Sequence, residues 1–202
     1  MITSSGKTLA DRWLEEGALV FDAHPSLARG ATDALGRRAS PSRWMLAALE
    51  IVRARAVHAR RSSRAVDASL VVKYARALGA AVLVVGASIA AGFSLLASVT
   101  LAVVAFYWVE VQRVFVVLLG IEGAGDPVRE SAALVRAQGG TGIALVRVLR
   151  IAAHMLTGGL RGEGFVRSWC VGCIAVVCWY EYARAQSAMA TAPGSRWSSP
   201  HA

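Results

Sequence analysis

The sequence predicts an all-α integral membrane protein, and three observations lead to this fold class. The first is a run of 33 residues without a charged side chain, from Ala77 to Val109, bracketed by Arg76 and Glu110. A bilayer core about 30 Å thick is crossed by roughly 20 apolar residues of helix, and soluble domains almost never carry so long an uncharged run. The second is a composition that is 55% hydrophobic, with a mean hydropathy of +0.49. The third is a basic front portion, since residues 1–76 carry 13 Lys or Arg against 7 acidic residues.

The uncharged run is too long for one helix and predicts a transmembrane hairpin over residues 77–121. As a single helix its 33 residues would rise about 50 Å, which exceeds the thickness of the hydrocarbon core. The apolar character resumes after a charged interruption as VFVVLLGI, residues 114–121. We therefore expect two spans that meet between Ser94 and Ser98.

The first of these spans is rich in small residues at helical spacing. Gly86 and Ala90 lie four residues apart, and so do Ser88 and Gly92. Small residues at this spacing let helix backbones approach closely, which favours association with another helix in lipid. Glycine is also frequent in transmembrane helices in general, so both interpretations stay open.

The second span carries polar side chains, of which Glu110 and Arg113 are three residues apart and share one helix face. Ionisable groups in hydrocarbon are costly and therefore usually pair or face a polar interior. The structural interpretation is an ion pair between these two side chains that fixes the rotation of the helix. The functional alternative is a polar site for a proton or a ligand. A third interpretation is that the span ends early and leaves both side chains at the interface.

A second membrane hairpin is predicted over residues 143–185. Its first half is apolar except for Arg147, Arg150 and His154, which recur at steps of three and four and form one stripe. This half either spans the bilayer with the stripe facing the bundle or lies in the interface. No cofactor is the default expectation, and a haem or chlorophyll-type pigment on His154 is the alternative. Aromatic residues mark both ends of the second half as interfacial anchors, so we expect four spans with both termini inside.

The residues before the first span predict a basic cytoplasmic region. Residues 1–42 hold a short amphipathic helix over residues 8–21 and then a looped stretch over residues 25–41. Residues 43–76 form a basic amphipathic juxtamembrane helix, with an interruption near residues 61–63 as the alternative. Such cations are typical of the cytoplasmic side of a bacterial inner membrane, and they attract anionic lipid. No nucleic-acid-binding module is recognisable in the sequence, so we expect no nucleic-acid partner. The side chains expected to face lipid headgroups are Arg53, Arg55, Arg60, Arg61, Arg64, Lys73 and Arg76.

Two polar segments complete the chain. Residues 122–142 predict a cytoplasmic loop with a short helix from Pro127 to Gln138. Asp126 before a proline is a favourable helix start, and Gly139 is a favourable stop. Residues 186–202 predict a disordered tail.

One pattern has chemical potential, the C-x-x-C pair of Cys170 and Cys173. Two thiols at the start of a helix can have lowered pKa values and exchange disulfides. The run CVGCIAVVC resembles, in cysteine spacing, the motif of membrane enzymes that oxidise protein dithiols and pass electrons to quinone. Val177 stands where those enzymes carry an arginine, and their second cysteine pair is absent from this sequence. Structural cysteines are the default expectation and a redox pair is the alternative, and no spacing predicts a metal site.

These features favour a structural role over catalysis. We expect a small multi-pass membrane protein that is an accessory subunit of a larger membrane complex, because packing features abound and no catalytic arrangement is visible. One alternative is a membrane thiol oxidoreductase that uses Cys170 and Cys173. The other is a pigment-binding or transport subunit that uses the polar side chains within the spans.

Overall fold

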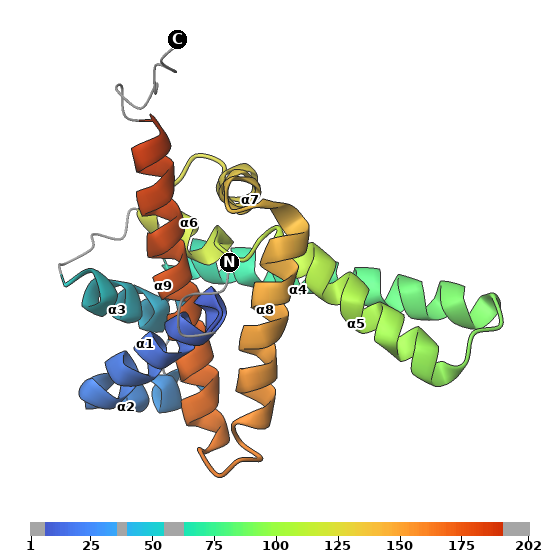
Figure 1. Ribbon diagram of the computed structural model, residues 1–202, viewed down its shortest axis with the longest axis horizontal. Coiled ribbons are helices and arrows are strands. Elements are labelled where there is room, and N and C mark those ends of the chain that lie inside the picture. Colours follow the sequence, from blue (N-terminus) through green and yellow to red (C-terminus); the bar gives the residue numbers. More distant parts are fainter. Residues whose placement is uncertain (1–6, 36–39, 55–62, 192–202) are drawn as a thin grey trace, which may run out of the picture.

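The chain folds into α-helices throughout its described residues, as the sequence predicts. The structure is a computed structural model that describes residues 7–35, 40–54 and 63–191. We call α1–α3 together with α6–α9 the helical body, from which α4 and α5 extend (Figure 1). The helices of the described residues are α1 (Leu9–Ala23), α2 (Pro25–Leu35), α3 (Pro41–Arg53), α4 (Ser63–Ala90), α5 (Leu95–Val111), α6 (Val116–Glu122), α7 (Pro127–Ala137), α8 (Gly140–Thr157) and α9 (Phe165–Thr191).

Helix α9 forms the centre of the helical body, and α1, α3 and α8 pack against it. Its Trp179 stacks on Trp13 of α1 with ring centroids 5.5 Å apart, and it meets Phe115 edge-on at 4.9 Å. Helix α1 approaches α9 closely at Gly17, where an added Cβ would lie 2.8 Å from the carbonyl oxygen of Val171. Aromatic packing and one close helix crossing therefore hold the N-terminal helix in place.

The close crossing predicts that Gly17→Ala destabilises the helical body. The new methyl group would overlap the backbone of α9, which cannot yield as a flexible side chain can. Overpacking of this kind costs about 1–3 kcal/mol. The measurement is the thermal unfolding midpoint of the purified chain in mild detergent, followed by circular dichroism.

A matched control is Gly79→Ala in α4, where an added Cβ meets nothing within 4 Å. Alanine is a better helix former than glycine by about 1 kcal/mol, so this midpoint is expected to stay or rise. Because Gly17→Ala gains the same helix propensity, equal midpoints for Gly17→Ala and Gly79→Ala would show that α1 is not packed on α9 at this crossing.

The predicted helix at the N-terminus is confirmed as α1, whose capping box joins Thr8 and Asp11. The prediction of a looped stretch over residues 25–41 is wrong, because residues 25–35 form α2. Proline is tolerated in the first turn of a helix, and Leu27 and Ala31 are buried one turn apart on its inner face.

The predicted juxtamembrane helix is divided in the described residues. Helix α3 ends at Arg53, followed by Ala54 with a left-handed φ of 51°, and α4 begins at Ser63 and continues into the uncharged run. The predicted helix over 127–138 is confirmed as α7. Helix α9 extends to Thr191, so residues 186–191 of the predicted disordered tail are helical, and the remainder lies outside the described residues.

Helices α4 and α5 lie side by side and extend away from the helical body as one arm (Figure 1). The turn that joins them comprises residues 91–94, slightly before the predicted division between Ser94 and Ser98. Large apolar side chains are exposed along the length of this α4–α5 pair, namely Leu78, Val82, Leu83, Ile89, Phe93, Leu95, Leu96, Val99, Leu101, Val103, Val104 and Trp108. Such a surface is unfavourable in water and marks a membrane or protein contact.

Three stretches of the described helices are long and apolar enough to cross a membrane: Val66–Ala90, Leu95–Glu122 and Gly140–Thr157. The chain therefore has the helices of a membrane protein. The fourth predicted span lies in α9, which is not among them. The apolar side chains of α9 instead pack inside the helical body, where Val171 and Trp179 are fully buried.

Candidate functional site

Three backbone amides of the turn between α4 and α5 are hydrogen-bonded within the hairpin. The amides of Ala91, Gly92 and Phe93 donate to carbonyl oxygens of α4 over 2.9–3.0 Å. Gly92 has a φ of 83°, a conformation that glycine adopts without strain. Ser94 caps α5 by accepting a hydrogen bond of 3.3 Å from the amide of Ala97. Backbone groups in hydrocarbon must be paired internally, so this turn fits a lipid environment.

Lys73 of α4 and Glu110 of α5 form a buried ion pair at the base of the α4–α5 pair. Nζ lies 2.6 Å from Oε1, and only 6% and 11% of the two side chains are exposed. The prediction that Glu110 pairs with Arg113 is wrong, since α5 ends at Val111 and Arg113 follows in the break before α6. The prediction that Lys73 faces lipid headgroups is wrong as well. The ion pair joins the two helices where the uncharged run begins and ends.

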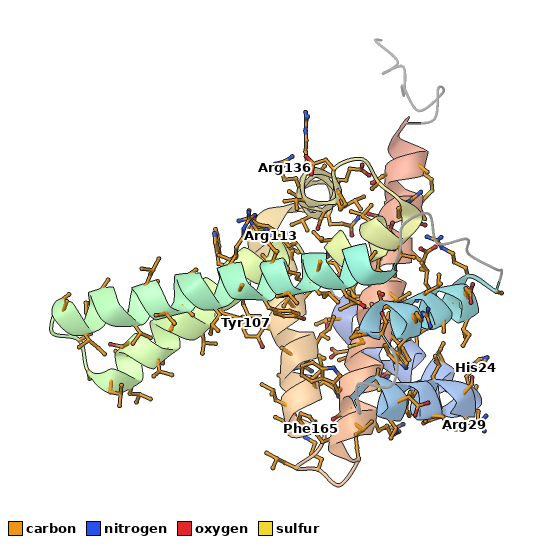
Figure 2. The ribbon with its side chains drawn as sticks, turned by 180° about the vertical axis from the view of Figure 1, so that it is seen from behind. His24, Arg29, Tyr107, Arg113, Arg136 and Phe165 are labelled. Atoms are coloured by element: carbon orange, nitrogen blue, oxygen red, sulfur yellow. The ribbon has the colours of Figure 1, made fainter. Side chains whose placement is uncertain are left out.

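Arg76 and Arg113 lie beside this ion pair and line a pocket of about 290 Å³, which we call the arginine pocket. Figure 2 shows Arg113 at the junction of the α4–α5 pair with the helical body, on the side of α7. The positive charge of Arg76 acts on Arg113, and neither forms an ion pair with a carboxylate of the described residues. The pocket lining consists of Ala68, Val72, Lys73, Arg76, Arg113, Val116 and Val128.

Arg53 is the centre of a second charged network, which joins α3, α6 and α9. Nη1 lies 2.5 Å from Oε1 of Glu122 and Nη2 lies 2.5 Å from Oε1 of Glu181, with 9% of the arginine side chain exposed. Tyr180 and Arg184 also donate to Glu122. Burial alone would lower the pKa of Arg53, but its hydrogen bonds to Glu181 and Glu122 outweigh burial and raise it. The prediction that Arg53 faces lipid is therefore wrong, and the side chain holds the helical body together.

The structure describes only some of the other side chains that were predicted to face lipid headgroups. Arg55, Arg60 and Arg61 lie outside the described residues, as does the side chain of Arg64. Arg76 is exposed. Arg76 is thus the described member of that set whose guanidinium remains available to a headgroup.

The arginines of the α8 stripe face α1 rather than a polar interior of a membrane bundle. The Cζ atom of Arg147 lies 5.6 Å from the ring of Trp13 and 5.8 Å from the ring of Trp179. Nε of Arg150 donates to Asp11 over 2.8 Å. Cation–π and ionic contacts with the N-terminal helix therefore account for both arginines.

His154 completes the stripe near the end of α8. Its Nε2 atom is buried without a hydrogen-bond partner in the described structure, and Glu163 is 3.9 Å away. His24 has its Nδ1 atom 2.9 Å from the carbonyl oxygen of Val20. The described residues contain no group of three or more His, Cys, Asp or Glu side chains placed to hold a metal ion.

The three cysteines of α9 are free thiols. Burial raises the pKa of the Cys170 thiol to about 11 and that of the Cys173 thiol to about 12. Disulfide exchange needs the thiolate, which is favoured when a cation or a helix N-terminus lowers the pKa. The surroundings of this pair do not favour redox chemistry at neutral pH.

The sequence reasoning missed the acidic half of the Arg53 network. Tyr180 and Arg184 are four residues apart, and this spacing is a local signal of a contact within α9. Arg53 and Glu181 are separated by 128 positions in the chain, and no spacing rule covers such a distance.

Comparison with known proteins gives no assignment for this chain. No family model, no curated protein and no solved structure matches it. The exposed α4–α5 pair, its buried ion pair and the arginine pocket are therefore the features that a function must explain.

Proposed function

We propose that this chain is a structural or accessory subunit of a larger complex in a bacterial inner membrane, anchored by its α4–α5 pair. The surface of this pair is uncharged over residues 77–109, and three amides of its turn are hydrogen-bonded to carbonyl oxygens of α4. Both properties suit hydrocarbon. The excess of cations in residues 1–76, 13 against 7 acidic residues, supports a cytoplasmic N-terminal region.

The length of α5 supports a hairpin whose turn stays inside the bilayer, in place of four complete spans. Helix α5 has 17 residues and rises about 26 Å, less than the roughly 30 Å of a bilayer core. Helix α6 cannot extend the lipid contact, because residues 116–121 are all buried in the helical body. The α4–α5 pair then enters and leaves the membrane on the cytoplasmic side.

The direction of α8 supports an interfacial position for this helix. Figures 1 and 2 both show α8 running across the direction of the α4–α5 pair, on the side of the body from which the pair extends. Its exposed apolar side chains Val146, Leu149 and Leu156 share one face. When the α4–α5 pair enters the bilayer, this face lies along the membrane surface, as in amphipathic interfacial helices.

The observation that carries the proposed role is an open face of small residues on α4. Gly79 and Gly86 are exposed, and an added Cβ at either position meets nothing within 4 Å. These glycines therefore do not serve the contact with α5, which is formed by the opposite side of α4 around the buried Ser88. In lipid, such a face lets a helix of another membrane protein approach closely.

The test is the size of the native assembly after extraction of membranes in mild detergent. Gly86→Leu fills the open face without touching the remainder of the chain, so we expect the chain to fold but to run as a smaller species. Ala87→Leu adds the same bulk to another exposed flank of α4 and is expected to leave the assembly intact. A wild-type chain that runs as a monomer, or an assembly that survives Gly86→Leu, would refute the accessory-subunit proposal.

A further inference from the structure

We propose that the arginine pocket binds the phosphate group of an anionic phospholipid. The pocket joins Arg76 of α4 to Arg113, with apolar walls from α4, α6 and α7. Lys73 also lines it, but its charge is balanced by Glu110 at 2.6 Å. The two arginines bring like charges together, and although Glu110 also acts on Arg113, its ion pair is with Lys73. A bound anion would relieve this repulsion.

The place of the pocket in the fold selects a lipid phosphate over other anions. Arg76 is the last charged residue before the uncharged run, and Arg113 follows Glu110 at its end. Both guanidinium groups thus lie where the α4–α5 pair leaves hydrocarbon, at the depth of lipid phosphates. Arginine is well suited to this ligand, because its planar fork can form two hydrogen bonds with one phosphate.

The apolar walls of the pocket favour an amphiphile over a soluble phosphate. Val72 lines the pocket and is 50% exposed, and Val71 next to it is 70% exposed. On the other side of Arg76, Leu78 is 60% exposed and begins the apolar surface of the uncharged run, where an acyl chain can lie. A net surplus of two positive charges also disfavours a zwitterionic headgroup, which would bring its own cation into the pocket.

This inference rests on the membrane anchor of the proposed function but not on a partner subunit. The experiment therefore uses the full chain, purified and delipidated in mild detergent. The probes are phosphatidylglycerol, phosphatidylcholine with the same acyl chains, and inorganic phosphate, and binding is read by native mass spectrometry over a titration. We expect phosphatidylglycerol to bind about 25-fold more tightly than phosphatidylcholine, since each of the two arginines contributes about a fivefold preference for anionic lipid.

The variants Arg76→Gln, Arg113→Gln and their combination remove charge from the pocket. The double variant is expected to bind phosphatidylglycerol about 25-fold more weakly and phosphatidylcholine unchanged, and each single variant about fivefold more weakly. Arg136→Gln removes one charge from α7 outside the pocket lining (Figure 2) and is expected to bind as the wild type does. Unfolding midpoints confirm that each variant is folded, and the single variants carry the test if the double variant is not.

Three results would overturn the inference: equal binding of the two lipids, an equal loss with Arg136→Gln, or inorganic phosphate binding as tightly as phosphatidylglycerol. The last result would identify a site for soluble phosphate. A chain that selects phosphatidylglycerol through both arginines but forms no larger assembly supports the lipid site and contradicts only the accessory-subunit proposal.

Discussion

Aspartate at both Val82 of α4 and Val104 of α5 is expected to release the chain from membranes. The two valines are 62% and 45% exposed on the α4–α5 pair, so neither change disturbs a packed interior. An aspartate near the middle of a membrane helix costs about 2.5–3.5 kcal/mol on the insertion scale, and two cost roughly 5–7 kcal/mol. The measurement is alkaline carbonate extraction of membranes, in which the wild type stays in the pellet and the double variant moves to the supernatant.

The control places the same two charges on the helical body, at Leu19 of α1 and Met189 of α9. These side chains are exposed to a similar degree, 73% and 64%, but they lie outside the α4–α5 pair. The Leu19→Asp, Met189→Asp variant is expected to stay in the pellet. If it is released and the α4–α5 variant is retained, the membrane anchor lies elsewhere in the chain.

The α4–α5 pair was predictable from the sequence because its cause is local. An uncharged run of 33 residues has one low-energy environment, and its length forces a turn. The position of the turn was less predictable. Ser94 caps α5 through its side chain, so the helix starts directly after it, whereas the prediction let the helices meet anywhere from Ser94 to Ser98.

The wrong partner for Glu110 came from spacing along one helix, since Arg113 lies three residues away on what was predicted to be the same helix face. In two antiparallel helices, residues at equal distances from the turn lie opposite each other. Lys73 is 19 positions before Gly92 and Glu110 is 18 positions after it, so the correct turn brings the two side chains together. A turn centred near residue 96 would instead place a residue of the uncharged run opposite Glu110.

The predicted fourth span failed for a different reason. Lipid and the interior of a helical body select the same apolar side chains, so hydropathy alone cannot distinguish them. Ile174 and Val177 of α9 are fully buried by protein, although the same residues would suit a membrane. The deciding contacts come from α1 and α3, which are more than a hundred positions away in the chain and leave no local pattern.

Arg53→Ala is expected to destabilise the helical body by about 3 kcal/mol, because it removes one member of a buried ion network. Glu181 loses this partner, and Glu122 is left with Arg184 and Tyr180 alone. Glu122 and Glu181 would then face each other across the gap, with side chains 16% and 29% exposed. This partial exposure places the cost at the lower end of the range for buried pairs, since water screens the freed charges. The measurement is the thermal unfolding midpoint in mild detergent, with a fall on the order of 10 °C for a chain of this size.

Two variants separate loss of the network from loss of one arginine. Arg29→Ala removes an exposed arginine of α2 and is expected to leave the midpoint unchanged. Adding Glu122→Gln and Glu181→Gln to Arg53→Ala removes the two carboxylate charges, and a buried site without charges often tolerates the loss of its ion pairs. The triple variant is therefore expected to recover part of the lost stability. A triple variant less stable than Arg53→Ala alone would show that the cost comes from lost side-chain packing, not from the carboxylates that lost Arg53.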